Sequence, residues 1–362
     1  MRTPQIEQEG LPYLTARLPG IGGVLRRQPE DFRVEEVPLY LPTGQGEHLY
    51  VRVTKRGLST PDLVSSMASI LGVKARCIGV AGLKDARAVT TQLVSVQGID
   101  PEALARLDRD QRILSVEVLG QHGNRLRTGH HAGNRFRIVI RDVDVDAAAR
   151  VAEILDEVMR RGMPNYFGPQ RQGRGGLNYQ TGAALLRDAE RRGRMPRSQR
   201  MWFLHAYQSY LFNRIVSARI DRLDRMLVGD WAMKHVNGAC FEVQDAETEQ
   251  VRAEAFEISP TGPLFGSRAP WASGEPGNLE RAVAAEVGET PESLRQAASA
   301  CGFRGERRAL RAKAQDLEWS VDERSLTLSL VLPPGAYATS FLREIMKPER
   351  GSETPGTRES SA

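Results

Sequence analysis

Apolar and polar residues alternate in four segments of the first 141 residues, as expected for strands with one buried and one exposed face. These segments cover residues 31–37, 48–55, 90–97 and 135–141. Between the second and third lies "STPDLVSSMASILG", where Leu63, Met67, Ile70 and Leu71 form an apolar stripe. Thr60 suits the cap position and Pro61 the first helical position, so the pattern predicts a helix that crosses a sheet.

The middle of the chain is dominated by helical periodicity. Residues 146–162 predict a helix that is closed by Gly162, and the pattern continues through further helical stretches. In contrast, the segment "SPTGPLFGSRAPWASGEPGN" is rich in glycine and proline, and we interpret it as a long, mobile loop. The other predicted helices of this part cover residues 177–192, 198–223 and 289–302.

Strand patterning returns after about Arg311. Residues 325–332 ("SLTLSLVL") are followed by a "PPG" turn and by a short helix, "ATSFLREIM". Because an isolated hairpin is only marginally stable in water, these strands are expected to complete the sheet that begins in the first third. The helical part is then an insertion into an α+β fold, and the polar residues 351–362 are expected to form a disordered tail.

Charge is unevenly distributed along the 362 residues, whose formal net charge is +5. Residues 121–141 hold five arginines and no acid, and residues 160–225 hold fourteen arginines against four acids. Two such basic tracts fit a polyanionic partner. Solvated surfaces without a ligand explain them equally well.

The three cysteines are scattered, and no apolar run approaches the length that spans a bilayer. The first residues, "MRTPQIEQEG", lack the apolar stretch of a secretory signal. We therefore expect a protein of the reducing cytoplasm.

Several common types of site are missing from the sequence. It contains neither a phosphate-binding Walker loop nor a dinucleotide fingerprint, and no serine stands in a nucleophile elbow. His130 and His131 are adjacent, so their side chains diverge, and no Cys-x-x-Cys or His-Glu-x-x-His spacing occurs. We expect neither a cofactor nor a metal.

One carboxylate remains as a candidate for chemistry. In "AGLKDARAV", Gly82 permits a tight turn, and Asp85 follows it with Lys84 and Arg87 as neighbours. Nearby cations favour the charged form of an aspartate, which could then attack an electrophilic carbon or remove a proton. An ordinary turn aspartate in a surface ion pair is the commoner use of such a segment.

Five motifs occur in an order that is similar to that of the tRNA pseudouridine synthase D (TruD) family. They are "PEDFRVEE", "GLKDARAVT", "GNRF", "NYFGPQRQG" and "LPPGAYATSFLRE", which together extend over nearly the whole chain. Ordered motifs on separate elements are far more specific than any one alone. The chain departs from the family pattern at Gln172, where phenylalanine is usual, and at Arg26, where lysine is usual.

The resemblance implies an enzyme that isomerises uridine to pseudouridine at position 13, in the D arm of tRNA, without cofactor or metal. It places the catalytic aspartate at Asp85 and the substrate-binding residues at Phe32, Asn134 and Tyr337. No obligate protein partner is expected, and the protein is expected to be a monomer. The implied fold is a discontinuous pseudouridine-synthase domain of mainly antiparallel sheet (residues 1–161 and 313–350), interrupted by a helix-rich insertion domain (residues 162–312).

Supporting roles within this resemblance are less sharply defined. Lys84 or Arg26 is expected to supply the counter-charge to the catalytic carboxylate, and Phe136 is expected to be a core residue beside the site. Phe32 could also be plain strand core, and Tyr337 could cap a helix instead of stacking on a base. In "NYFGPQRQG", we interpret the segment as a connecting loop, with Arg171 and Arg174 as candidates for phosphate contact.

Two other functions stay open from the sequence. One is an RNA-binding protein that keeps a basic cleft but has lost catalysis. The other is a hydrolase of the glycosidase kind, which needs a second carboxylate at a defined separation from Asp85. Glu35 and Glu36 are the obvious partners, although neighbouring strand residues point to opposite faces and at most one can face the site.

Overall fold

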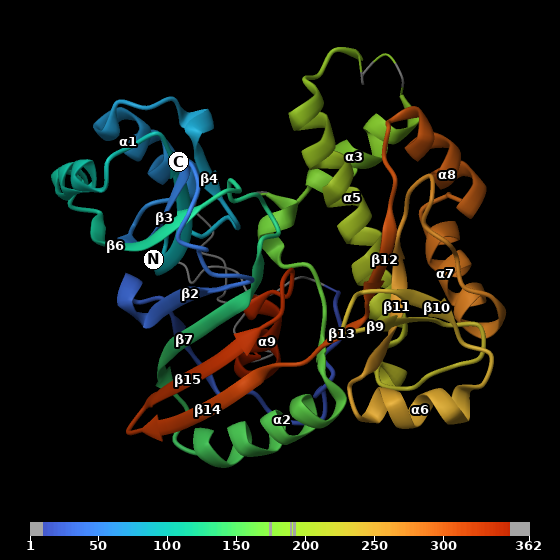
Figure 1. Cartoon of the computed structure of the whole chain (residues 1–362). Helices are drawn as coiled ribbons and strands as arrows, with labels where there is room; N and C mark the ends of the chain where they lie inside the picture. The colour runs from blue at the N-terminus through green and yellow to red at the C-terminus, as the bar shows by residue number, and fades with distance from the viewer. Residues whose placement is uncertain (1–9, 174–175, 189, 191–192, 348–362) are drawn as a thin grey trace, which may run out of the picture.

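The computed structural model describes residues 10–173, 176–188, 190 and 193–347, and Figure 1 shows them as two lobes that lie side by side. One lobe is built around a nine-stranded sheet, and the other combines a four-stranded sheet with several helices. Residues 351–362, the predicted tail, lie outside the described residues.

The nine-stranded sheet joins strands from both ends of the chain. Its order is β14-β15-β7-β2-β5-β3-β6, with β1 added on β7 and β4 on β5. Neighbours among the described strands are antiparallel except β2 and β5, which are parallel. Since β15 pairs with β7, the prediction that the late strands complete the early sheet is confirmed. The strands are β1 (Gly22–Leu25), β2 (Phe32–Pro38), β3 (His48–Arg56), β4 (Ile78–Val80), β5 (Val89–Gln97), β6 (Ile113–His122), β7 (His131–Val143), β14 (Gln315–Asp322) and β15 (Ser325–Leu332).

Alternation along β7 places one face of the sheet in the core. Phe136 and Ile138 are buried while Arg135 and Arg137 are exposed, as the period of two demands. Helices α2 (Ala147–Arg161) and α9 (Ala338–Met346) cover the buried face through their own apolar residues. Each large apolar side chain buried in this way contributes about 1.5–3 kcal/mol.

Helix α1 (Thr60–Leu71) packs on the part of the sheet formed by β3 and β5, as the apolar stripe predicts. The prediction that Thr60 caps this helix was wrong. Ser59 is the N-cap residue and its side chain accepts from the Asp62 N–H, which places Thr60 inside the first turn. Both hydroxyls suit a cap by residue type, and only the extended backbone of Ser59 decides between them. The short 3-10 helices of this lobe are η1 (Pro29–Asp31), η2 (Ala75–Cys77) and η3 (Pro101–Arg109).

The second lobe contains more sheet than the sequence predicts. Its four strands run in the order β10-β9-β11-β12 and pack with the helices of this part of the chain. No helix within the described ranges has the length and apolar character needed to cross a bilayer. The elements are α3 (Asn178–Arg187), α5 (Arg197–Ala218), η5 (Ile220–Arg222), β9 (Trp231–Lys234), β10 (Cys240–Glu242), α6 (Ala246–Glu254), β11 (Ile258–Leu264), α7 (Gly274–Glu286), α8 (Pro291–Ala300) and β12 (Glu306–Ala309).

The interpretation of residues 259–278 as a long loop was wrong except for residues 265–273, which lie outside helices and strands. This segment supplies most of β11, whose residues are all buried, and the start of α7. Pro260 lacks an N–H but its carbonyl accepts from the Leu310 N–H, so a proline fits here without a lost hydrogen bond. Pairing with β9 and β12 outweighs the local preference of glycine and proline for loops.

Two short strands lie where the chain passes between the lobes. β8 (Met163–Pro164) pairs with β13 (Arg311–Ala312), which brings together residues nearly 150 positions apart. The Asn165 side-chain amide donates to the Ala309 carbonyl at 2.9 Å, and its oxygen accepts from Arg308 at 2.6 Å. The 3-10 helix η4 (Pro169–Gln172) follows directly after this junction.

Candidate active site

Asp85 lies in the loop between β4 and β5, and this loop has little freedom. The loop begins directly after β4, in which a Cβ on Gly79 would lie 2.5 Å from both the Leu126 carbonyl oxygen and the Ser95 hydroxyl, so only glycine fits there. The Lys84 N–H donates to the Thr60 hydroxyl at 2.8 Å, which joins the loop to the first turn of α1. The backbone that carries Asp85 is therefore fixed from two sides.

Three donors contact the Asp85 carboxylate. Arg26 Nη1 lies 2.8 Å from Oδ2, and Gln170 Nε2 lies 3.1 Å from the same oxygen. The backbone N–H of Arg87 donates to Oδ1 at 3.1 Å. The Asp85 side chain is 30% exposed, so it is neither dry core nor a freely solvated turn residue.

These donors keep Asp85 ionised. Burial acts to raise the pKa of its carboxyl group, but the charge and hydrogen bond of Arg26 and the backbone N–H groups of Arg87 and Ala86 outweigh burial. The pKa of Asp85 is lowered as a result. An anionic oxygen is what nucleophilic attack or proton removal requires.

Arg26 reaches Asp85 from an uncommon backbone conformation. Its φ of 57° lies in the left-handed region, which costs a residue other than glycine about 1 kcal/mol or more. The guanidinium carbon lies 4.0 Å from the centre of the Phe32 ring, so cation–π attraction and the ion pair with Asp85 hold the same group. Strain of this kind persists only where the surroundings enforce it.

Lys84 points away from its neighbour Asp85. Its Nζ lies 2.6 Å from Glu36 Oε2, and the two side chains are 5% and 1% exposed. The other oxygen of Glu36 accepts from the Leu93 N–H at 3.2 Å. Of the two cations expected as counter-charge, Arg26 is thus the one that contacts Asp85.

A second buried lysine lies within electrostatic reach of the site. Lys55 on β3 is fully buried and donates to the Leu58 carbonyl. Burial lowers its pKa to about 8, while the charge of Asp85 acts in the opposite direction. The sequence pattern gave no reason to single out Lys55.

The predicted residues Phe32, Asn134 and Phe136 share one face of the sheet. Asn134 is the cross-strand partner of Glu36, and Phe136 that of Val34, and partners directly opposite each other project to the same side. The rings of Phe32 and Phe136 meet edge to face, 6.0 Å between centroids. Asn134 Oδ1 is buried and has no hydrogen-bond partner among the described residues.

Phe32 is further fixed by the residue before it. Asp31 is 1% exposed and accepts from Arg141 at 2.7 Å, an ion pair that joins η1 to β7. Because Arg141 belongs to the first basic tract, part of the charge in that tract is structural.

Tyr337 stands at the N-cap position of α9, but its side chain makes no capping hydrogen bond. Its ring instead contacts Phe167 edge to face, with centroids 5.8 Å apart. A Cβ on Gly168 would lie 2.9 Å from Tyr337 Cδ1, so glycine is needed for this close approach. Gln170 follows two residues later, and the same segment thus touches both Tyr337 and Asp85.

The structure therefore links only some of the predicted residues to Asp85. Arg26 contacts both Phe32 and Asp85, and the segment that carries Gln170 reaches Tyr337. Asn134 lies opposite Glu36, whose partner Lys84 points away from Asp85. The roles assigned to these residues stay predictions.

Neither Gln170 nor Thr60 was among the predicted site residues. Gln170 lies within the motif "NYFGPQRQG", but that motif was interpreted as a connecting loop, and the hydroxyl of Thr60 was assigned to a cap. Arg171 lies over the Phe167 ring at 5.5 Å, and Arg174 lies outside the described residues.

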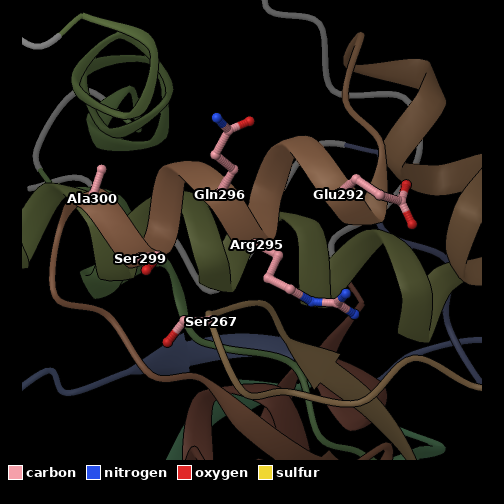
Figure 2. A pocket seen from close by; sticks show the side chains of 6 residues that line it. All are labelled: Ser267, Glu292, Arg295, Gln296, Ser299 and Ala300. Atoms are coloured by element: carbon pink, nitrogen blue, oxygen red, sulfur yellow. The ribbon is translucent and has the colours of Figure 1, made fainter.

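We also searched the described residues for metal-ligand groups and for hollows near Asp85. No group of three or more His, Cys, Asp or Glu side chains in the described part of the chain could hold a metal ion. An open hollow of about 500 Å³ lies on α8, and Figure 2 shows the six residues that line it. None of the six is among the residues that donate hydrogen bonds to Asp85, which are Arg26, Arg87 and Gln170.

A family model described as tRNA pseudouridine synthase D (TruD) matches residues 8–192 and 190–345. The chain belongs to the tRNA pseudouridine synthase D family. A member from Geobacter metallireducens is 41% identical over 397 residues, covering 92% of this chain and 97% of its own length. A member from Thermus thermophilus is 44% identical over 347 residues, covering 94% of this chain and 93% of its own length. Both are named tRNA pseudouridine synthase D.

The fold of the family is also that of this chain. A crystal structure from Methanosarcina mazei, of a protein assigned to tRNA pseudouridine synthase D, is similar with a TM-score of 0.77 at 26% identity. The match covers 96% of this chain and 99% of the Methanosarcina mazei chain. The predicted α+β fold with a mainly antiparallel sheet is confirmed.

Proposed function

We propose that this protein isomerises uridine to pseudouridine in tRNA, at position 13 of the D arm, with Asp85 as the catalytic group. Family membership supports the reaction, and the resemblance of the motifs supports the position. The observation that carries the role of Asp85 is its ion pair with Arg26, which keeps a half-buried carboxylate charged.

The proposed reaction conserves every atom of the nucleoside. The bond between C1′ and N1 breaks, the uracil turns, a bond forms between C1′ and C5, C5 loses its proton and N1 gains one. Because nothing is oxidised or reduced and no group is gained, residues of the chain suffice and no cofactor is invoked. Asp85 either attacks C1′ or removes the 2′ proton to give a glycal, and both routes need its anionic form.

Base flipping gives the other predicted residues their proposed tasks. Taking a uridine out of its stack costs a few kcal/mol, which contacts to the flipped base must offset. The free Oδ1 of Asn134 is a suitable acceptor for an N–H on the uracil edge. Tyr337 offers a partly exposed aromatic surface for the base.

Phe32 is proposed to act together with Arg26. The guanidinium lies over the ring, so Phe32 supports a flat cationic surface instead of presenting a bare aromatic face. Bases stack on guanidinium planes as they do on aromatic rings. Phe32 is 3% exposed and the Arg26 side chain 9%, so contact with the substrate falls to the small exposed part of Arg26, which also holds Asp85.

The proposed domain division follows the two sheets. Residues 1–161 and 313–350 would form the catalytic domain, and residues 162–312 the insertion domain, with the β8–β13 pair at the boundary. We propose that a monomer binds tRNA, which requires no further protein, and that it acts in the cytoplasm, where a tRNA-modifying enzyme meets its substrate.

A glycosidase-like hydrolase is less well supported. Glu36 faces the same side of β2 as Phe32, but it is fully engaged by Lys84 and the Leu93 N–H. Glu35 is exposed and points to the opposite face. Neither is available as a second carboxylate for Asp85. A binding protein without catalysis would have no use for a carboxylate that is held charged and half-exposed.

Mapping pseudouridines in total RNA from cells with and without this gene tests the proposal. We expect the mark at position 13 of a subset of tRNAs to disappear and to return with the wild-type gene. Loss of a mark at another tRNA position would overturn the position, and no change in any RNA would overturn the function.

A further inference from the structure

We propose that Gln170, a residue of the second lobe, is a positioning residue for Asp85 that holds Oδ2 and leaves Oδ1 as the reacting oxygen. This inference rests on the proposed function, because it concerns the carboxylate assigned to catalysis. It makes the active site a joint product of the two lobes.

The two oxygens of Asp85 have unequal surroundings. Oδ2 accepts from Arg26 Nη1 at 2.8 Å and from Gln170 Nε2 at 3.1 Å, which occupies both of its lone pairs. Oδ1 accepts the backbone N–H of Arg87 at 3.1 Å and has no charged donor among the described residues, while the backbone N–H of Ala86 also favours the ionised carboxylate. Hydrogen bonds reduce the basicity of the atom that accepts them, so Oδ1 is the more reactive oxygen.

Gln170 is held to the helices of the second lobe through its near neighbour Gln172. The Gln172 side chain donates to the Ala206 carbonyl of α5 at 3.0 Å and accepts from the Tyr179 N–H of α3 at 3.2 Å. A side chain with both a donor and an acceptor is needed to make these two bonds. The position of η4, and with it that of Gln170, therefore follows the position of α3 and α5.

The same segment is also attached to the first lobe. The Ser340 hydroxyl of α9 donates to the Tyr166 carbonyl at 3.0 Å, and Gly168 lies against Tyr337. Asn213 of α5 makes reciprocal hydrogen bonds with the backbone N–H and carbonyl of Phe167, at 2.8 and 3.0 Å. Gln170 thus extends from a segment that both lobes fix, which is how a positioning group keeps its geometry.

The charged groups around Asp85 determine what a change at Gln170 does. Arg26 contacts the carboxylate, Lys55 lies within electrostatic reach, and Lys84 is neutralised by Glu36. A carboxylate at position 170 would stand beside Oδ2, and a neighbouring like charge raises the pKa of an acid.

The test is the pH dependence of single-turnover pseudouridine formation on an unmodified tRNA transcript. For Gln170→Glu we expect the acid limb of the profile to move up by about one pH unit. Gln296→Glu is the matched control, since Gln296 is an exposed residue of α8 in the same lobe (Figure 2) and the change adds the same charge. Gln170→Ala is expected to slow the single turnover by about tenfold with unchanged tRNA affinity, the effect of a displaced catalytic group.

The outcomes separate this inference from the proposed function. If Asp85→Asn is inactive but Gln170→Glu follows the profile of Gln296→Glu, or Gln170→Ala turns over at the wild-type rate, Gln170 has no positioning role and the proposed function stands. If Asp85→Asn turns over normally, the proposed function fails first. Should Gln170→Glu not fold, as judged by thermal unfolding, the rate of Gln170→Ala decides.

Discussion

Arg26 donates from Nη1 to Oδ2 of Asp85 over 2.8 Å, and the same guanidinium lies over the ring of Phe32. An arginine at this place combines a permanent charge with a flat surface, which a lysine ammonium does not. Arg26 therefore connects the ionisation of Asp85 to the aromatic residue expected at the substrate.

The pH dependence of the reaction should follow this ion pair. In the wild type the pKa of Asp85 is lowered, so the carboxylate stays charged and Asp85 causes no loss of activity until the pH falls below its usual range. Removing the charge with Arg26→Gln leaves burial to raise this pKa relative to the wild type. We expect activity at pH 5 to fall more than activity at pH 8, measured as single-turnover rates.

Arg26→Lys is the matched control, because it keeps the charge and loses the flat guanidinium. Its acid limb should stay close to that of the wild type. Superimposable pH profiles for Arg26→Gln and the wild type would show that Arg26 does not set the ionisation of Asp85.

The buried pair of Lys84 and Glu36 should act on stability. Glu36→Gln leaves Lys84 as a buried cation without its partner, which is expected to lower the free energy of unfolding by about 3 kcal/mol or more. Chemical denaturation measures this change. Glu117→Gln is the control, since it breaks the exposed pair with Arg52, which should be worth less than about 1 kcal/mol. Equal losses in the two variants would contradict the importance of burial.

Binding of tRNA should weaken as salt concentration rises, because neutralised phosphates release counterions. Arg127 is exposed in the segment beside the Asp85 loop, where the Gly129 N–H donates to the Ala81 carbonyl. Arg127→Gln is expected to reduce the slope of log affinity against log salt by about one. Arg106→Gln, an exposed change on η3, should leave the slope unchanged. An affinity that does not vary with salt would argue against phosphate contacts altogether.

Local pattern was sufficient for part of the nine-stranded sheet, but it did not identify β1, β4 or β6. Alternation identified β2, β3, β5 and β7, and the need to pair β15 placed the end of the chain in the same sheet. The same rules failed for β11, whose prolines and glycines are accommodated by two neighbouring strands. Tertiary pairing of this kind leaves no local signal.

Local sequence was also not sufficient to predict the contacts of the candidate site. The motif that contains Asp85 identifies the carboxylate, but its neighbours in sequence gave no way to choose between Lys84 and Arg26 as its partner. That choice depends on a left-handed backbone at Arg26 and on Glu36, a distant residue in sequence that engages Lys84. Gln170 comes from the other lobe, where only the three-dimensional arrangement relates it to Asp85.

The most direct test of the central claim is single-turnover pseudouridine formation by Asp85→Asn on an unmodified tRNA transcript, with tRNA affinity measured alongside. Asparagine keeps the size of the side chain and removes the negative charge. We predict that no pseudouridine forms while tRNA binds nearly as tightly as to the wild type. Pseudouridine formation by Asp85→Asn at a rate near that of the wild type would contradict the assignment of Asp85 as the catalytic group.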